Sequence, residues 1–181
     1  MYGMVNRAVE ELLVEQFGQA TWERVRARAG LDVDVFVSNE PYPDSLTYDL
    51  VAAASAELGV PPTAILERFG EHWILVTASR GYGALLTSTG RTVPEFLQNL
   101  GVLHDRLSMI MPHLRPPRFV VEDLTETTFT LHYFSERHGL THFTIGLLRG
   151  LGTRLGTPVT VEVRARQDEG ADHDVFRVTW A

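Results

Sequence analysis

The 181-residue chain contains no cysteine. Disulfides, thiolate nucleophiles and cysteine-ligated metal centres are therefore excluded, and any transition metal must be bound by histidine or carboxylate. No apolar run approaches the roughly 18 residues of a membrane-spanning helix. The first residues also lack the basic region, apolar run and cleavage site of a secretory signal. These absences predict a cytoplasmic protein that does not insert into a membrane.

Positive charge is also scarce, with 16 Lys and Arg against 23 Asp and Glu and a net charge of -7. Nucleic-acid binding depends on neutralising phosphates, so we expect no nucleic-acid partner. The chain has no internal repeat and no low-complexity linker, and 44% of its residues are hydrophobic. Its length suits one compact domain, long enough to bury both a core and a pocket.

The first half is predicted to be helical, because apolar residues recur every three to four positions. Helices are expected over residues 5–17, 21–29, 45–58 and 63–77, and the last of these places Trp73 on its apolar side. Two prolines and the lack of a period predict a loop over residues 36–44. Gly81-Tyr82-Gly83 predicts a sharp turn between helices, since it lacks the further residues of a phosphate-binding loop.

Residues 92–119 carry the histidine of greatest interest, His104. Thr92 and Glu95 form a capping box that predicts a helix start. The helix is expected to continue to the Pro116-Pro117 pair, burying Phe96, Leu100, Leu103, Leu107 and Ile110. His104 falls at the edge of this apolar stripe. A lone histidine there is more often a hydrogen-bonded boundary residue than a metal ligand, so both readings stay open at this point.

The last third is predicted to contain strands and one helix. Residues 118–123 and 127–135 form a hairpin in which Phe129, Leu131 and Tyr133 share a face. If that strand continues, Tyr133, Ser135 and Arg137 form a row of donors suited to a ligand with two carboxylates. The alternative is a strand end that exposes polar residues.

A glycine-rich helix over residues 140–155 should permit close approach of another element, and two strands rich in valine follow it. The sequence thus predicts an α+β fold, in which a helical lobe packs on a lobe built from a four-stranded antiparallel sheet and helices.

These motifs together resemble the haem-nitric oxide/oxygen-binding (H-NOX) family, which includes the haem domain of soluble guanylate cyclase. The resemblance rests on the opening MYGMVNRAVEELL, the segment FVSNEPYPDSLTYDLVAAAS, the His104 helix followed by LRPPRF, and the Tyr-x-Ser-x-Arg motif at Tyr133, Ser135 and Arg137. It covers essentially the whole chain. It implies one domain over residues 1–181, with a helical lobe over about 1–62, a ligand-helix and sheet lobe over about 63–181, and haem between them.

The resemblance also implies roles for individual residues. His104 would bind the iron of haem b (iron protoporphyrin IX), and Tyr133, Ser135 and Arg137 would hold the haem propionates. Pro117 would press on the macrocycle. Trp73 matches an aromatic wall position on the distal side in some members.

The distal side decides which gas the family member retains. Oxygen-binding members have a tyrosine nine residues after the motif tyrosine, where this chain has His142. Three placements of His142 are open: it faces the pocket as a donor, it coordinates iron, or it points elsewhere after a one-residue shift. Because the tyrosine of the oxygen-binding members is missing, we expect nitric oxide as the ligand, with oxygen or carbon monoxide as alternatives.

By the same resemblance, nitric oxide would weaken the bond between iron and His104 and shift the N-terminal helices. The chain contains no cyclase or kinase segment, so we expect a sensor rather than an enzyme. Its effector would be a separate protein such as a histidine kinase or a cyclic-dinucleotide enzyme.

Other classes of function fit the sequence less well. His138 and His142 are spaced as zinc ligands, but Gly139 interrupts them and no HExxH pattern is present. A peroxidase would need a distal Arg-His pair, which the spacing does not provide. A haem carrier without gas-dependent signalling stays open.

Overall fold

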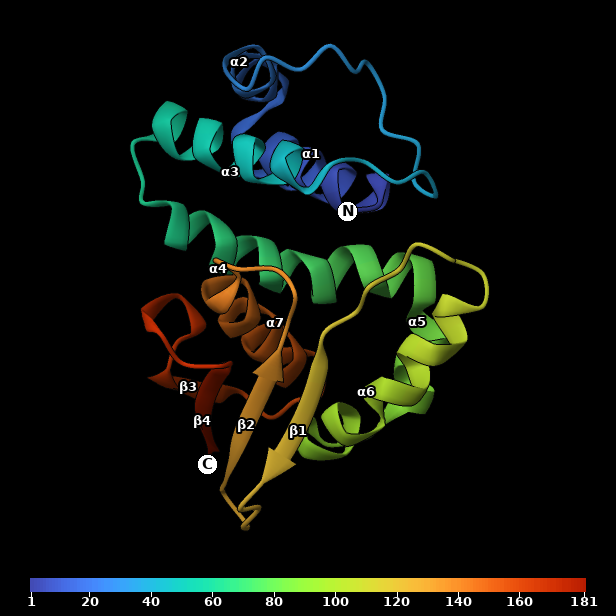
Figure 1. Cartoon of the computed structure of the whole chain (residues 1–181), viewed down its shortest axis with the longest axis vertical. Coiled ribbons are helices and arrows are strands. Elements are labelled where there is room, and N and C mark those ends of the chain that lie inside the picture. Colours follow the sequence, from blue (N-terminus) through green and yellow to red (C-terminus); the bar gives the residue numbers. More distant parts are fainter.

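The computed structural model describes residues 1–181 as helices packed on one antiparallel sheet (Figure 1). The elements are α1 (Gly3–Phe17), α2 (Gln19–Arg28), α3 (Asp44–Leu58), α4 (Pro62–His72), the π-helix η1 (Trp73–Thr77), α5 (Ala78–Thr89), α6 (Val93–Ser108), β1 (Arg118–Glu122), β2 (Thr128–Phe134), α7 (Thr141–Arg154), β3 (Val159–Ala165), the 3-10 helix η2 (Gln167–Glu169) and β4 (Asp174–Trp180). None of the helices combines the length and apolar content that crossing a membrane requires. The predicted α+β class is confirmed.

Helices α1, α2 and α3 form one group, drawn at the top of Figure 1. Their core includes Val9, Leu12 and Leu13 of α1, as the periodicity predicts, together with Trp22 and Leu50. Phe17 ends the predicted stripe but is 37% exposed, because α1 stops there and Gly18 turns the chain at φ 84°. Two residues of α4, Ile65 and Phe69, complete this core.

Helix α4 and η1 form a central rod across the middle of the molecule, and α5 follows without an intervening loop and bends down on the right of Figure 1. The turn predicted at Gly81-Tyr82-Gly83 corresponds to a kink within α5. Tyr82 leaves helical geometry there, at φ -136° and ψ 23°, so two helical segments meet at this point without an intervening loop. The π segment that precedes it is a local widening of the helix, a feature that is common at functional sites.

Helix α6 carries His104 and is shorter than predicted. The Thr92 hydroxyl caps its start by accepting from the Glu95 amide, and the Glu95 carboxylate accepts from the Arg91 amide. The helix ends at Ser108, well before Pro116. Ile110 therefore lies past the helix end and is 72% exposed, which contradicts its predicted burial. The following turn instead buries Met111.

The sheet has the strand order β1-β2-β4-β3, with every neighbouring pair antiparallel. Phe129, Leu131 and Tyr133 of β2 are buried on one face, as the alternation predicts. They join Phe176 and Val178 of β4 in a second core that also includes residues of η1, α5, α6 and α7. Strand β2 ends at Phe134, so the condition that it continues as far as Arg137 is not met, and Ser135 and Arg137 lie in the loop that follows.

Helices α4 and α7 cross at unusually short range because glycines face each other there. A Cβ atom added to Gly146 would lie 2.8 Å from the Glu67 carbonyl carbon, and one added to Gly70 would lie 2.6 Å from the Leu147 nitrogen. The close approach predicted for the glycine-rich helix is therefore confirmed. It places α7 directly under the central rod.

Candidate functional site

One apolar cavity of about 300 Å³ lies between the central rod, α6, α7 and the sheet. Of its 31 lining residues, 23 are hydrophobic, so a ligand that fills it must present a largely apolar surface. Six of the seven residues predicted for the site line this cavity: Trp73, His104, Pro117, Tyr133, Ser135 and Arg137. They come from η1, α6, the turn after α6, β2 and the loop after β2.

His104 is held with one ring nitrogen free. Burial lowers the pKa of His104, and a hydrogen bond with the Pro117 backbone opposes that effect. Proline has no N–H, so the Pro117 carbonyl must accept and the imidazole must donate. A neutral imidazole that donates through one nitrogen keeps a lone pair on the other, the form that binds a metal.

Tyr133 and Ser135 form a polar corner of the otherwise apolar cavity. Burial raises the pKa of Tyr133, and hydrogen bonds with Ser135 and Thr144 partly offset this rise. The Ser135 hydroxyl also accepts from the Arg137 amide at 3.0 Å. Both hydroxyls are therefore fixed by neighbouring groups, although Ser135 lies beyond the end of β2.

Arg137 is oriented by two acceptors from distant parts of the chain. Its Nε donates to Asp44 Oδ2 at 2.8 Å, and its Nη1 donates to the Arg115 carbonyl at 2.8 Å. A guanidinium has five N–H groups, so three stay available for a further carboxylate. With its side chain only 21% exposed, Arg137 is held at the cavity edge in a position to donate hydrogen bonds to an anion.

Asp44, at the end of the predicted loop over residues 36–44, is a contact of Arg137 that no sequence pattern indicated. Burial alone would raise the pKa of Asp44, but hydrogen bonds from the Met1 ammonium and from Arg137 outweigh it and lower the pKa. Asp44 and Arg137 are 93 residues apart, so no local pattern could have paired them. Tyr2 was also missed: it lines the cavity, and its hydroxyl accepts from the His113 amide at 2.9 Å.

Of the three placements left open for His142, the structure has the third, in which the side chain points away from the cavity. Its Nδ1 lies 2.8 Å from Glu67 Oε1 on α4, and Glu67 also binds Arg149 at 2.6 Å. His142 does not line the cavity, whereas the next residue, Phe143, does. The reason is the helical rotation of about 100° per residue, which turns adjacent side chains of α7 to different faces.

The alternative zinc site is not assembled either. His138 is 68% exposed and lies 3.8 Å from Asp168, while His142 contacts Glu67 on a different element. No three His, Asp or Glu side chains converge in a way that could hold a metal ion. The spacing of the two histidines therefore does not correspond to a shared ligand set.

The donor set of the cavity fits haem. Haem needs an apolar slot for its macrocycle, a neutral imidazole for its iron and hydrogen-bond donors for two propionates. The cavity supplies the slot, His104 keeps a free lone pair, and Arg137 with two hydroxyls forms a cationic corner. The side chains found together therefore match the chemistry of this one cofactor.

Comparisons with known proteins agree with this match. A family model described as haem-NO-binding covers residues 2–163. The soluble guanylate cyclase gcy-31 of Caenorhabditis elegans is 29% identical over 180 residues, which include 98% of this chain and 26% of that protein. The beta-2 subunit of rat soluble guanylate cyclase is 35% identical over 88 residues, 49% of this chain and 13% of its own length. This chain thus spans about a quarter of the length of gcy-31 and less of the rat subunit.

Solved structures share the fold. An H-NOX protein from S. oneidensis in the Fe(II)NO ligation state superposes with a TM-score of 0.89 at 20% identity, covering 100% of this chain and 99% of that one. An oxygen-binding H-NOX domain related to soluble guanylate cyclases, solved as its oxygen complex, gives 0.80 at 20% identity, with 99% and 95% covered. Because the family model matches about nine-tenths of this chain, the chain belongs to the haem-NO-binding (H-NOX) family, whose cofactor is haem.

Proposed function

We propose that this chain is a haem-based sensor of nitric oxide, in which His104 ligates the iron and Tyr133, Ser135 and Arg137 hold the propionates. The observation that carries the proposal is the pairing of a neutral His104 with a cationic corner across one apolar cavity. When bound, haem would supply an iron that can bind a diatomic gas. The chain supplies the other ligand and the surroundings.

His104 has an acceptor beside its ring in the Pro117 carbonyl. An imidazole N–H that donates to this carbonyl favours the tautomer with the other nitrogen unprotonated. Phe119 lies beside the ring, with centroids 6.4 Å apart. Since Pro117 also lines the cavity, a movement of this turn would displace both His104 and the macrocycle.

The wall formed by α7 favours nitric oxide over oxygen. Its cavity-lining residues are Phe143, Leu147, Leu148 and Leu151, and none of them can donate a hydrogen bond. Oxygen bound to haem is polar and is stabilised by a donor, which the apolar α7 face does not provide. With His142 turned toward Glu67, the only donor anticipated on this helix is unavailable.

Two routes link the cavity to the rest of the chain. His104 connects it to α6, and Arg137 connects it through Asp44 to α3 in the N-terminal helical group. A ligand that changes the tension at either end would shift the balance between two arrangements of these groups. We propose that a separate effector, such as a histidine kinase or a cyclic-dinucleotide enzyme, reads this shift, and that the chain itself is not a catalyst.

Oxygen binding is the second candidate, and Trp73 and Tyr82 favour it. Both line the cavity, and neither the indole N–H nor the phenol hydroxyl bonds to another group of the protein. Either could donate to a polar gas. A ferrous spectrum that converts stably to an oxygen-bound form in air, and that Trp73→Phe or Tyr82→Phe abolishes, would replace nitric oxide by oxygen in this proposal.

The test begins with the purified protein and its absorption spectrum. We expect a Soret band, a nitrosyl spectrum after addition of nitric oxide, and no stable change in air. His104→Ala should lose haem, and exogenous imidazole should restore it. The matched control is His113→Ala, since His113 is an exposed cavity-edge histidine whose backbone amide, not its ring, bonds to Tyr2. A protein that cannot be reconstituted with haem would refute the proposal.

A further inference from the structure

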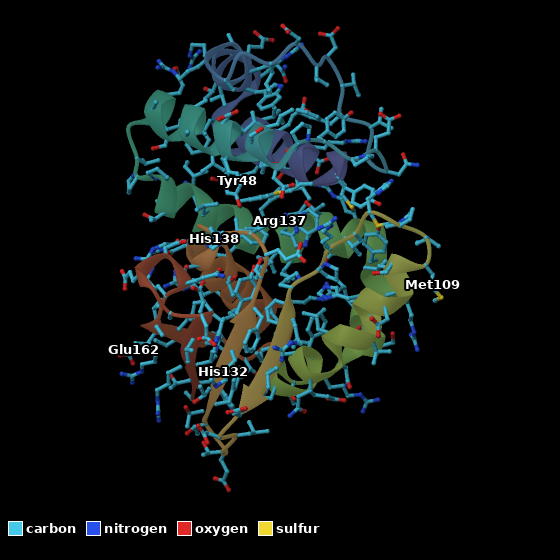
Figure 2. All side chains as sticks on the ribbon, viewed as in Figure 1. Tyr48, Met109, His132, Arg137, His138 and Glu162 are labelled. Atoms are coloured by element: carbon cyan, nitrogen blue, oxygen red, sulfur yellow. The ribbon has the colours of Figure 1, made fainter.

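The loop after β2, residues 135–140, carries Ser135 and Arg137 and yet has little structure of its own. No backbone-to-backbone hydrogen bond involves residues 135–139. Ordering each residue of such a loop costs about 1–2 kcal/mol, so its conformation must come from side chains outside it. Figure 2 shows the loop residues Arg137 and His138 below Tyr48, at the junction of the helical group and the sheet lobe.

The peptide unit between His138 and Gly139 is held at both edges. Its carbonyl accepts from the Tyr48 hydroxyl at 2.8 Å, and its N–H donates to Asp168 Oδ1 at 3.3 Å. Gly139 adopts φ 74°, a conformation that favours glycine, so the peptide is also fixed by residue type. This peptide lies one residue beyond Arg137.

Helix α3 supplies both contacts that reach the loop from the N-terminal helical group. Asp44 and Tyr48 are four residues apart and therefore lie on the same face of the helix. Asp44 binds the Arg137 side chain at 2.8 Å, while Tyr48 binds the backbone just after it. Burial and the Asp44 charge raise the pKa of Tyr48, so its hydroxyl keeps its proton at neutral pH and remains a donor.

We infer that Tyr48 is a positioning residue for propionate binding, acting through the His138 carbonyl to fix the loop that presents Ser135 and Arg137. This inference rests on the proposed haem site and adds a residue 90 positions away from the loop it holds. The helical group is then part of the cofactor site, since releasing Tyr48 loosens Arg137. By reciprocity, propionate binding strengthens the docking of α3.

The test compares Tyr48→Phe with the wild type in protein reconstituted with haem. The substitution removes one neutral hydrogen bond, so we expect haem to transfer to an acceptor protein roughly two- to tenfold faster. The same measurement with haem dimethyl ester should show no difference between the two proteins, because esters cannot accept the charge-assisted bonds that the loop provides. A purely structural defect would speed the loss of both cofactors equally.

Two controls and a second variant complete the experiment. His138→Ala keeps the carbonyl that Tyr48 binds and should behave as the wild type. Tyr42→Phe removes a hydroxyl that accepts from the Val37 amide within the helical group, and should also leave haem loss unchanged. Asp168→Ala removes the acceptor that holds the same peptide from its other edge, and should repeat the ester-dependent loss even if Tyr48→Phe does not fold.

Equal haem loss in Tyr48→Phe and the wild type, or an equal effect on the ester, would overturn the inference. Failure of the proposed haem site itself has a different signature, because the wild type would then show no Soret band with either cofactor.

Discussion

Replacing Gly146 by alanine tests the crossing of α4 and α7, which positions the face of α7 that lines the cavity. Alanine is the better helix former by about 1 kcal/mol, so local propensity alone predicts stabilisation. The structure predicts the opposite. The added methyl would overlap the Glu67 carbonyl oxygen and would lie 2.8 Å and 3.0 Å from the Glu67 carbonyl carbon and Cα.

The size of the effect follows from the nature of these neighbours. They are backbone atoms of α4 and cannot rotate away, so the two helices must separate. Overpacking of this kind costs about 1–3 kcal/mol, and a backbone obstacle puts the cost near the upper value. Subtracting the gain in helix propensity leaves a net loss of about 2 kcal/mol.

Thermal unfolding of the haem-loaded protein measures this loss. For a chain of this size 1 kcal/mol corresponds to about 2–4 °C, so Gly146→Ala should lower Tm by about 4–8 °C. Gly101→Ala is the matched control, because Gly101 lies exposed within α6 and an added Cβ has no atom within 4 Å. It should raise Tm by about 1–4 °C.

An unchanged or raised Tm for Gly146→Ala would refute the reasoning, since it would mean that the crossing adapts without cost. Separation of the helices should also move Phe143 and Leu147, which line the cavity from α7. We therefore expect a shifted Soret band in Gly146→Ala and an unshifted one in Gly101→Ala.

Three further predictions concern the capping, pairing and placement of single side chains. Thr92→Ala removes the acceptor for the Glu95 amide at the start of α6 and should lower stability by about 1 kcal/mol in urea unfolding, whereas Thr92→Ser should not. The pKa of Asp44 is lowered on folding, so its contribution to stability is present above the ordinary aspartate pKa of 3.8 and is lost as pH falls through the folded pKa. Asp44→Asn should accordingly lose less stability than the wild type between pH 6 and pH 3, and an equal loss would exclude this pairing. His142→Ala should leave the ferrous and nitrosyl spectra unchanged, because His142 contacts Glu67 outside the cavity; removing this partly exposed pair should cost less than about 1 kcal/mol.

Local patterns in the sequence predicted those features that depend on neighbours along the chain. The repeat of Val9, Leu12 and Leu13 placed the buried face of α1, and the alternation of Phe129, Leu131 and Tyr133 placed the buried face of β2. The Thr92 cap could also be predicted from the sequence, because its hydrogen bond spans only three residues. Each of these follows from the fixed geometry of a helix or strand.

Local patterns were less reliable for the end of a helix. Ile110 continues the apolar period of α6, yet the helix stops at Ser108 and the following turn buries Met111 against the cavity. At Gly81-Tyr82-Gly83 the pattern indicated a break in the helix, and the structure has a kink there at Tyr82. The residue that fills the core after a helix thus depends on tertiary contacts that the apolar period does not contain.

The sequence by itself determined which residues could bind a cofactor, namely His104 on an apolar helix and the donors Tyr133, Ser135 and Arg137. The absence of cysteine excluded a thiolate ligand. Only the tertiary structure decided how they are held. It paired Arg137 with Asp44, turned His142 to Glu67, and anchored the loop of Arg137 to Tyr48. The physical reason is that residue type and local period fix what a side chain can do and which face it occupies. The partner that it meets depends on segments 75 to 93 residues away, brought together only by packing.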